Sequence, residues 1–155
     1  MAKSFGPDVR VAVIAGDDAT IADLDMSVSV GPGWVSHLLQ RVAAFHLDSE
    51  SSQALVAAAG ESYSARRQRL IDGLSHYGLA ASGASGLNVW VPVADEQAAI
   101  EAVREAGYVV RAGDPYRISS SPAVRVTIAS LDDRQIDAVA AALGQHLSRR
   151  TSQSQ

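Results

Sequence analysis

Two basic residues near the start of the chain have side chains that can do chemistry: a lysine, which can form a Schiff base, and an arginine, which can bind a phosphate. Lys3 is the only lysine, and the other twelve of the thirteen basic residues are arginines. A lysine amine forms a Schiff base when it is desolvated or lies near other cations. Arg10 follows beyond Gly6-Pro7, a pair that predicts a turn, and an arginine there can bind a phosphate bidentately. A lysine at position three is, however, more often solvated and disordered.

A third candidate, Arg125, lies in the alternating segment 123–129. Val124, Val126 and Ile128 point to one side, so Arg125 projects from the opposite face. A guanidinium fork suits a carboxylate, and a lysine does not reproduce its bidentate geometry. From the residues alone, such an arginine is also typical of a surface ion pair.

Other polar and aromatic residues give weaker signals. Asn88 and Trp90 share a strand face, where they either line the same cleft or cover the outer side of the sheet. Tyr116 and Arg117 follow a turn, which favours a surface loop over a loop that overhangs the cleft. A basic cluster on a helix favours a solvated helix face over an anion site: Arg66, Arg67 and Arg69.

The composition is that of a globular protein and excludes several classes of site. Hydrophobic residues make up 47% and charged residues 19% of the 155 residues, and the net charge is −4. Nothing therefore attracts the chain to nucleic acid or to an anionic membrane. Cysteine is absent, and the histidines lack the spacing of a metal site: His37, His46, His76 and His146. Without a signal peptide or a membrane-length apolar run, we expect a cytoplasmic protein.

Helical spacing of apolar residues predicts an amphipathic helix over 34–47 and a long helix over 53–77 that ends near Gly78. Only a short helical turn is expected before them, near residues 21–25. Further along, Asp95 predicts the start of a helix that Gly107 ends. Residues 130–133 have capping-box character and predict a last helix.

The strands fall into two groups. Residues 9–15 are apolar at nearly every position, which predicts a strand buried on both faces of a sheet. Such a strand needs paired neighbours, yet the other candidates lie far downstream, at 87–93, 108–111 and 123–129. The first strand therefore indicates a sheet of which this chain holds only a part. From residue 49 onward, the order of elements predicts an α+β layer of about three strands with helices on one face.

The segment from Lys3 to Arg10 resembles the lysine segment of class I/II aminotransferases, the fold-type I enzymes that use pyridoxal phosphate. Their pattern is S-K-x-x-x-P-x-x-R or a close variant. Residues 31–40, 85–92 and 123–129 resemble segments of the aminotransferase-like domain of MocR-type regulators, which join that domain to a GntR-type winged helix. The resemblance covers almost the whole chain but only the C-terminal part of the family's domain.

For the fold, the resemblance implies the small C-terminal α+β domain of an α/β parent, reached by a long connecting helix and preceded by a strand of the large domain. Residues 1–48 would be a remnant of the large cofactor-binding domain. Residues 49–150 would form the small domain with its connecting helix, and residues 151–155 a frayed tail.

For the site, the resemblance implies that Lys3 binds pyridoxal phosphate and moves the proton at the substrate Cα. Arg10 would neutralise the cofactor phosphate, and Arg125 would bind the carboxylate of an amino acid or a 2-oxo acid. Ala2 departs from the family, which usually has serine before the lysine. The groups that the family supplies from further upstream are also absent, so we expect an incomplete transaminase that is inactive alone.

Two alternatives remain open. The chain could be a non-catalytic dimerisation or effector-sensing module of a MocR-type regulator, in which the helices 34–47 and 53–77 form a homodimer surface or contact a partner that supplies the missing domain. Because the winged helix is missing, direct DNA binding is not expected of it. A weaker alternative is a free-standing α+β domain that binds amino acids through Arg125.

Overall fold

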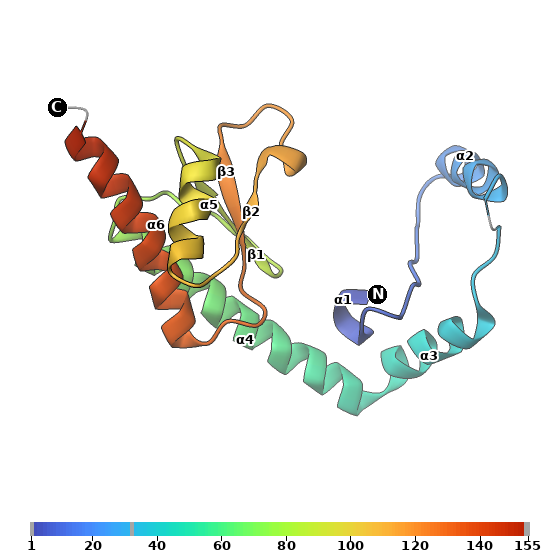
Figure 1. Ribbon diagram of the computed structural model, residues 1–155. Helices are drawn as coiled ribbons and strands as arrows, with labels where there is room; N and C mark the ends of the chain where they lie inside the picture. The colour runs from blue at the N-terminus through green and yellow to red at the C-terminus, as the bar shows by residue number, and fades with distance from the viewer. Residues whose placement is uncertain (1, 32, 154–155) are drawn as a thin grey trace. The chain divides into compact units, whose positions relative to one another are not determined.

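The computed structural model describes residues 2–31 and 33–153. These form two compact units, residues 1–58 (unit 1) and residues 59–155 (unit 2). The division falls inside helix α4 (Glu50–Ser75), whose place in the chain Figure 1 shows. The predicted domain boundary comes earlier, after residue 48, and the assignment of residues 1–48 and 49–150 to two domains stays a prediction.

Unit 1 contains α1 (Ala2–Phe5), α2 (Asp18–Ser29), α3 (His37–Asp48) and the first turns of α4. The helix α2 is longer than the short turn that was expected, and local capping explains where it starts. Asp17 accepts a 2.9 Å hydrogen bond from the backbone N–H of Thr20, which satisfies a free donor of the first turn. The predicted helix over 34–47 begins at residue 37, where Ser36 provides the cap.

The predicted buried strand over residues 9–15 is wrong. These residues form no strand, and no strand occurs among the described residues of unit 1 with which they could pair. Val9 is buried, but Val13 is 78% exposed and Ile14 63% exposed. An apolar run becomes a strand only when neighbouring strands bind its backbone groups, and this part of the structure offers none.

Unit 2 is built on a three-stranded antiparallel sheet in the order β1-β3-β2. The strands are β1 (Asn88–Pro92), β2 (Arg111–Ala112) and β3 (Ala123–Thr127). The first and last match their predicted positions. The strand β2, which is second in the chain but lies at an edge of the sheet, is shorter than the predicted strand over 108–111. It begins at residue 111, where the predicted strand ends.

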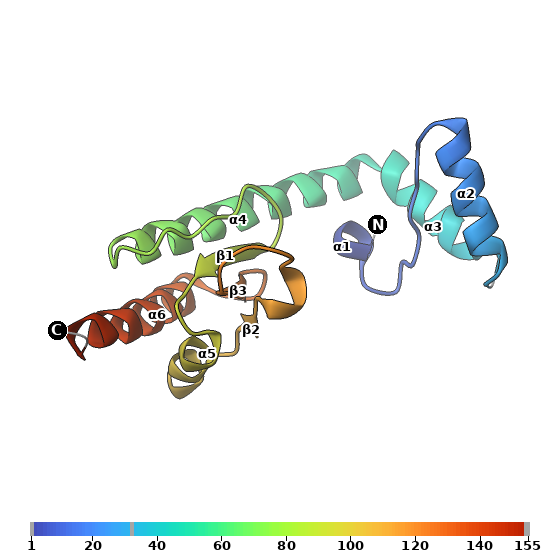
Figure 2. The same ribbon diagram turned by 90° about the horizontal axis from the view of Figure 1, so that it is seen from above.

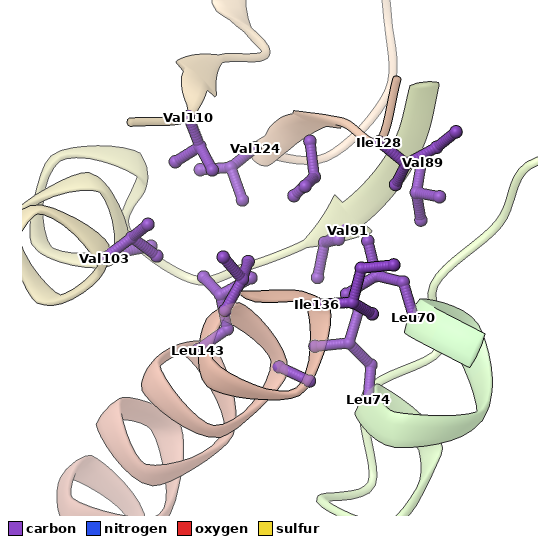
Figure 3. Close-up of a cluster of buried hydrophobic side chains, with 14 of the residues drawn as sticks. Leu70, Leu74, Val89, Val91, Val103, Val110, Val124, Ile128, Ile136 and Leu143 are labelled. Carbon is purple, nitrogen blue, oxygen red and sulfur yellow. The ribbon is translucent and has the colours of Figure 1, made fainter. Parts of the chain in front are cut away.

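Three helices cover one face of this sheet: the C-terminal half of α4, α5 (Glu96–Glu105) and α6 (Asp133–Gln153). In Figure 2, the C-terminal half of α4 runs beside α6. Gly73 of α4 lies against Ala140 of α6, and Gly144 of α6 lies against Tyr77, just after the end of α4. The buried side chains converge between helices and strands in Figure 3. Those with no exposed area include Leu70, Leu74, Val89, Val91, Val103, Val124, Ile128, Ile136 and Leu143. Each such side chain contributes roughly 1.5–3 kcal/mol relative to an exposed one.

The helix ends in unit 2 follow the predicted signals. Asp95 accepts a 3.1 Å hydrogen bond from the N–H of Ala98 at the start of α5. Gly78 and Gly107 adopt positive φ angles of 74° and 86° after α4 and α5. At the start of α6, Asp132 and Gln135 form a reciprocal capping box. The helix α6 continues to Gln153, so the expected frayed tail begins inside it, and residues 154–155 lie outside the described residues.

The arginines of the cluster on α4 are partly or fully exposed, as the favoured interpretation expected, and each also forms a hydrogen bond to another part of unit 2. Arg66 donates to the carbonyl of Ala129, and Arg67 donates to the carbonyl of Gly86 at 3.0 Å. Arg69 binds Asp137 of α6 through two hydrogen bonds of 2.9 and 2.6 Å. These hydrogen bonds hold the pKa of the Asp137 carboxyl below its usual value.

Candidate functional site

Arg125 lies at the centre of the outer sheet face, opposite the hydrophobic core. In the strand register it is the partner of Trp90 on β1 and of Arg111 on β2. Residues in register across antiparallel strands point to the same side, so these three form a row across the sheet. The next row pairs Asn88 with Thr127, whose hydroxyl donates to the Asn88 side chain at 2.8 Å. The prediction that Asn88 and Trp90 share a face is therefore confirmed.

The Arg125 guanidinium lies against an aromatic ring instead of a carboxylate. Its Cζ is 4.1 Å from the ring centroid of Tyr116. Its Nε is buried and makes no hydrogen bond within the described residues, and no ion pair to this arginine is found there either. A buried donor without a partner costs free energy, and a guanidinium donor has a carboxylate as its natural partner.

Tyr116 reaches Arg125 because the loop before β3 turns tightly against the sheet. The loop contains the short 3₁₀ helix η1 (Asp114–Tyr116), preceded by Gly113. The N–H of Gly113 donates to the carbonyl of Ala123 at 2.7 Å. A Cβ at position 113 would lie 2.5 Å from that carbonyl oxygen and 2.6 Å from Cη2 of Trp90. Glycine is therefore required sterically at this close approach.

Glu96, in the first turn of α5, joins both ends of this loop. Its carboxylate accepts hydrogen bonds from the N–H of Asp114 at 3.1 Å and from the N–H of Ala123 at 3.0 Å. The Nε of Arg117 lies 3.3 Å from the same carboxylate. Burial raises the pKa of Glu96, but the two amide hydrogen bonds and the charge of Arg117 outweigh this effect and hold its pKa below the usual value.

The two acidic side chains of this loop region are engaged by Arg117, not by Arg125. Arg117 donates to Asp114 at 2.9 Å, in addition to its contact with Glu96. The sequence-based interpretation of Tyr116 and Arg117 as a surface loop was therefore incomplete: the pair organises the surroundings of Arg125. Glu96 was not predicted at all, because an acidic residue in a first helical turn is ordinary.

Lys3 and Arg10 belong to unit 1, whereas Arg125 belongs to unit 2. Lys3 lies in α1 and Arg10 follows the turn at Gly6, which has a φ of 106° and accepts a hydrogen bond from the N–H of Val9. The predicted turn is confirmed. Both basic side chains are exposed, and neither has a hydrogen bond or an ion pair to another described residue. An amine and a guanidinium of this kind fit an aldehyde and a phosphate in chemical type.

Two other kinds of site are not found in the part of the chain that the structure describes. No group of three or more His, Asp or Glu side chains there is arranged to hold a metal ion. No helix in the same part is long and apolar enough to cross a membrane.

Comparisons with known proteins place these features in a family. The model of the family described as aminotransferase class I and II matches residues 1–143. The chain is 36% identical over 151 residues to the vitamin B6 salvage pathway transcriptional repressor PtsJ of Salmonella typhimurium. The aligned region covers 96% of this chain and 35% of that protein. The chain thus spans about a third of the length of this relative.

Solved structures agree on the fold. The α-aminoadipate aminotransferase LysN of Thermus thermophilus, in complex with N-(5'-phosphopyridoxyl)-L-leucine, matches with a TM-score of 0.73 and 17% identity over 94% of this chain and 40% of that one. The aromatic aminotransferase of Pyrococcus horikoshii matches with a TM-score of 0.71 and 18% identity over 88% of this chain and 38% of that one.

The helices and the small antiparallel sheet thus correspond to part of a fold-type I aminotransferase, which confirms the α+β fold that the resemblance implied. The similarity to a regulator, which the sequence segments had suggested, is confirmed as well. The chain belongs to the class I and II aminotransferase family.

Proposed function

We propose that Arg125 binds the carboxylate of an amino acid or a 2-oxo acid in an aminotransferase-like domain whose Lys3 and Arg10 bind pyridoxal phosphate. One observation supports this function above the others. The Arg125 side chain has a buried Nε without a hydrogen-bond partner among the described residues, and its guanidinium lies over the ring of Tyr116. A carboxylate supplies the missing acceptor and the missing counter-charge together.

The chemistry of Arg125 follows from its surroundings. The acids at this loop, Asp114 on η1 and Glu96 on α5, form ion pairs with Arg117 and none with Arg125. The fork of donors on a guanidinium lies in one plane and binds both oxygens of a carboxylate. Arg125 would therefore orient the substrate as well as attract it, which is what a transfer reaction requires of a binding group.

For the cofactor, Lys3 and Arg10 supply the two kinds of group that pyridoxal phosphate needs from a protein. The amine of Lys3 would bind the aldehyde covalently, and the guanidinium of Arg10 would bind the phosphate. When bound, the cofactor supplies an electron sink for negative charge at the substrate Cα. Lys3 would accept and return the proton at that carbon. Since the chain spans 35% of the length of its regulator relative, amino-group transfer is proposed for a complete domain.

The carboxylate part of this proposal is tested on the 155-residue chain by following the Nε–H resonance of Arg125 in NMR spectra. Pyruvate and L-alanine should shift this resonance saturably, and L-alaninamide, which lacks the carboxylate, should not. Arg125→Ala should weaken pyruvate binding, detected on other resonances of the sheet, by at least about tenfold, the loss of one charged hydrogen-bonded contact. Arg134→Ala, an exposed arginine on α6, is the matched control. Equal binding of L-alanine and L-alaninamide would contradict the proposal.

The cofactor part is tested by incubating the chain with pyridoxal phosphate, reducing with borohydride and mapping the labelled peptides. Because Lys3 is the sole lysine, only Lys3 and the terminal α-amine can react. We expect about one label per chain at Lys3, and less label in Arg10→Ala than in Arg134→Ala. Lys3→Ala separates the two amines. Weak labelling shared between Lys3 and the α-amine would show an ordinary exposed amine.

A second candidate function is effector sensing within a transcriptional regulator, as a homodimer or with a partner chain. The observation that favours it is the 36% identity to a repressor of a vitamin B6 salvage pathway. Sensing requires ligand binding without turnover. In a complete protein loaded with pyridoxal phosphate, an amino donor followed by a 2-oxo acid should regenerate the starting absorbance only if the protein is a transaminase.

A further inference from the structure

We propose that Tyr116 is a positioning residue for Arg125, and that Glu96 holds Tyr116 in place through the loop that carries it. This inference rests on the proposed role of Arg125 in carboxylate binding. It adds two residues from outside β3, one on η1 and one on α5, that no sequence signal connects with the arginine.

The first step is the contact between the guanidinium and the ring. A cation over an aromatic face is attracted by the ring quadrupole and uses none of its N–H groups. The 4.1 Å distance from Cζ to the Tyr116 centroid is of this kind. A carboxylate in the place of Tyr116 would instead occupy the donors and cancel the charge. The ring thus packs against one face of Arg125 without using any of its N–H donors, and the buried Nε keeps no partner among the described residues.

The second step is the attachment of the loop by Glu96, whose side chain is 11% exposed. One carboxylate oxygen accepts from the N–H of Asp114, two residues before Tyr116, and the other from the N–H of Ala123, two residues before Arg125. A single side chain therefore connects the turn that carries the ring with the strand that carries the arginine. Charge-assisted hydrogen bonds to backbone amides are among the stronger ones in proteins.

The third step concerns Arg117, which lies next to Tyr116 in the chain. It binds Asp114 at 2.9 Å and approaches Glu96 at 3.3 Å, so it compensates both negative charges beside the site. Without Arg117, those carboxylates would lower the local affinity for an anion through like-charge repulsion. The loop thus supplies both the aromatic support of Arg125 and the cation that shields it from nearby acids.

The test compares Tyr116→Phe with Tyr116→Leu in the 155-residue chain, with pyruvate as the probe. Phenylalanine keeps the aromatic face, so pyruvate affinity should stay within about twofold of the unsubstituted chain, whereas leucine should weaken it by about three- to tenfold. The ligand-free Nε–H shift of Arg125 gives a second readout. It carries the ring current of residue 116, so Tyr116→Phe should retain it and Tyr116→Leu should move it. Ile118→Ala, in the same loop and fully exposed, is the matched control.

Glu96→Gln tests the attachment separately. The amide keeps one acceptor but loses the charge, so pyruvate affinity should fall by about threefold and the Arg125 Nε–H signal should broaden or split as Tyr116 becomes mobile. If Tyr116→Leu and Glu96→Gln bind pyruvate like the unsubstituted chain while Arg125→Ala does not, this inference is wrong and the proposed function stands. If Arg125→Ala binds pyruvate normally, the proposed function itself fails.

Discussion

The two units of the chain are similarly apolar in sequence but differ in how much of that apolar surface they cover. Unit 2 buries a continuous cluster drawn from β1, β3 and three helices, with Val110 just before β2. Among its described residues, unit 1 buries only Val9 and Ala43, and it leaves Val30 and Trp34 90% and 74% exposed. The difference shows that an apolar sequence needs elements that cover it before it becomes a core.

Within unit 1, the uncovered surface includes an apolar groove of about 400 Å³ between residues 11–13 and α3. Its lining is mostly aliphatic: Val11, Ala12, Val13, Val35, Ala43, Ala44 and Leu47, with Gln40. Along this groove, unit 1 leaves aliphatic groups uncovered of the kind that unit 2 packs into its core. In unit 2, the apolar side chains of β1 and β3 face the core, whereas Trp90, Arg111 and Arg125 lie on the outer sheet face.

The largest effect is expected from removing a buried side chain in unit 2. Leu70→Ala should lower the free energy of unfolding by about 3 kcal/mol, since Leu70 has no exposed area and its loss leaves a cavity. Leu55→Ala lies on the same helix but within unit 1, where the side chain is 73% exposed, and should change stability by less than about 0.5 kcal/mol. Urea unfolding of both variants measures the difference. Equal losses would show that unit 1 has a core of its own.

A smaller effect tests whether close packing in unit 2 extends to the outer sheet face. Gly113→Ala should destabilise the chain by about 1–3 kcal/mol and weaken pyruvate binding, because its Cβ collides with Trp90 and with the Ala123 carbonyl. Gly60→Ala is the matched control: it lies inside α4 with no atom near its Cβ, and should stabilise by about 0.5–1 kcal/mol. A neutral Gly113→Ala would mean that the outer face is loosely packed.

The next prediction concerns the pH dependence of stability, which should differ between the two units. The pKa of Glu96 is lowered in the folded chain, so its contribution to stability is fully present above its unfolded-state value of 4.5 and is lost as the pH falls through the lower folded-state pKa. Glu96→Gln should abolish this part of the acid sensitivity of unit 2. The pKa of Asp17 is also lowered, by hydrogen bonds from Thr20. Protonation of Asp17 at low pH should therefore destabilise α2 alone. Amide resonances of the two units, followed during acid titration, separate the two losses.

The smallest effect concerns Arg111, which shares a row with Arg125 but is exposed. Arg111→Ala should weaken pyruvate binding by about twofold at low ionic strength, since it removes a neighbouring positive charge. The effect should vanish near 1 M salt, where the Debye length is about 3 Å. A loss as large as that of Arg125→Ala would instead make Arg111 a direct ligand.

Much of unit 2 could be predicted from sequence because its signals are local. The alternation of Val89 and Val91, and of Val124 and Val126, places β1 and β3 and assigns their buried faces. The same alternation places Arg125 on the outer face. In unit 1, the apolar run from Val9 indicates that the segment would be buried in a sheet. It does not indicate that neighbouring strands are present to pair with it, and for this reason the predicted strand was wrong.

The surroundings of Arg125 could not be predicted because they depend on contacts between distant residues. Glu96 binds amides 18 and 27 residues away, and backbone N–H groups carry no residue-type signal that would reveal these two contacts in the sequence. The ring of Tyr116 meets Arg125 only because Gly113 allows the turn to approach β3. Lys3, Arg10 and Arg125 came from resemblance, and their roles stay proposals.

The attachment of the loop at Asp114, Arg117 and Ala123 also has a consequence for protein engineering. The segment between Arg117 and Ala123 makes few ties of its own, and Ile118 in it is fully exposed. Both ends of that segment are fixed by the same carboxylate of Glu96. The length of the segment can therefore change without moving Arg125. A peptide epitope or a fluorescent reporter inserted after Ser119 should therefore leave Arg125 in place, which makes this loop a natural position for a sensor of carboxylate binding.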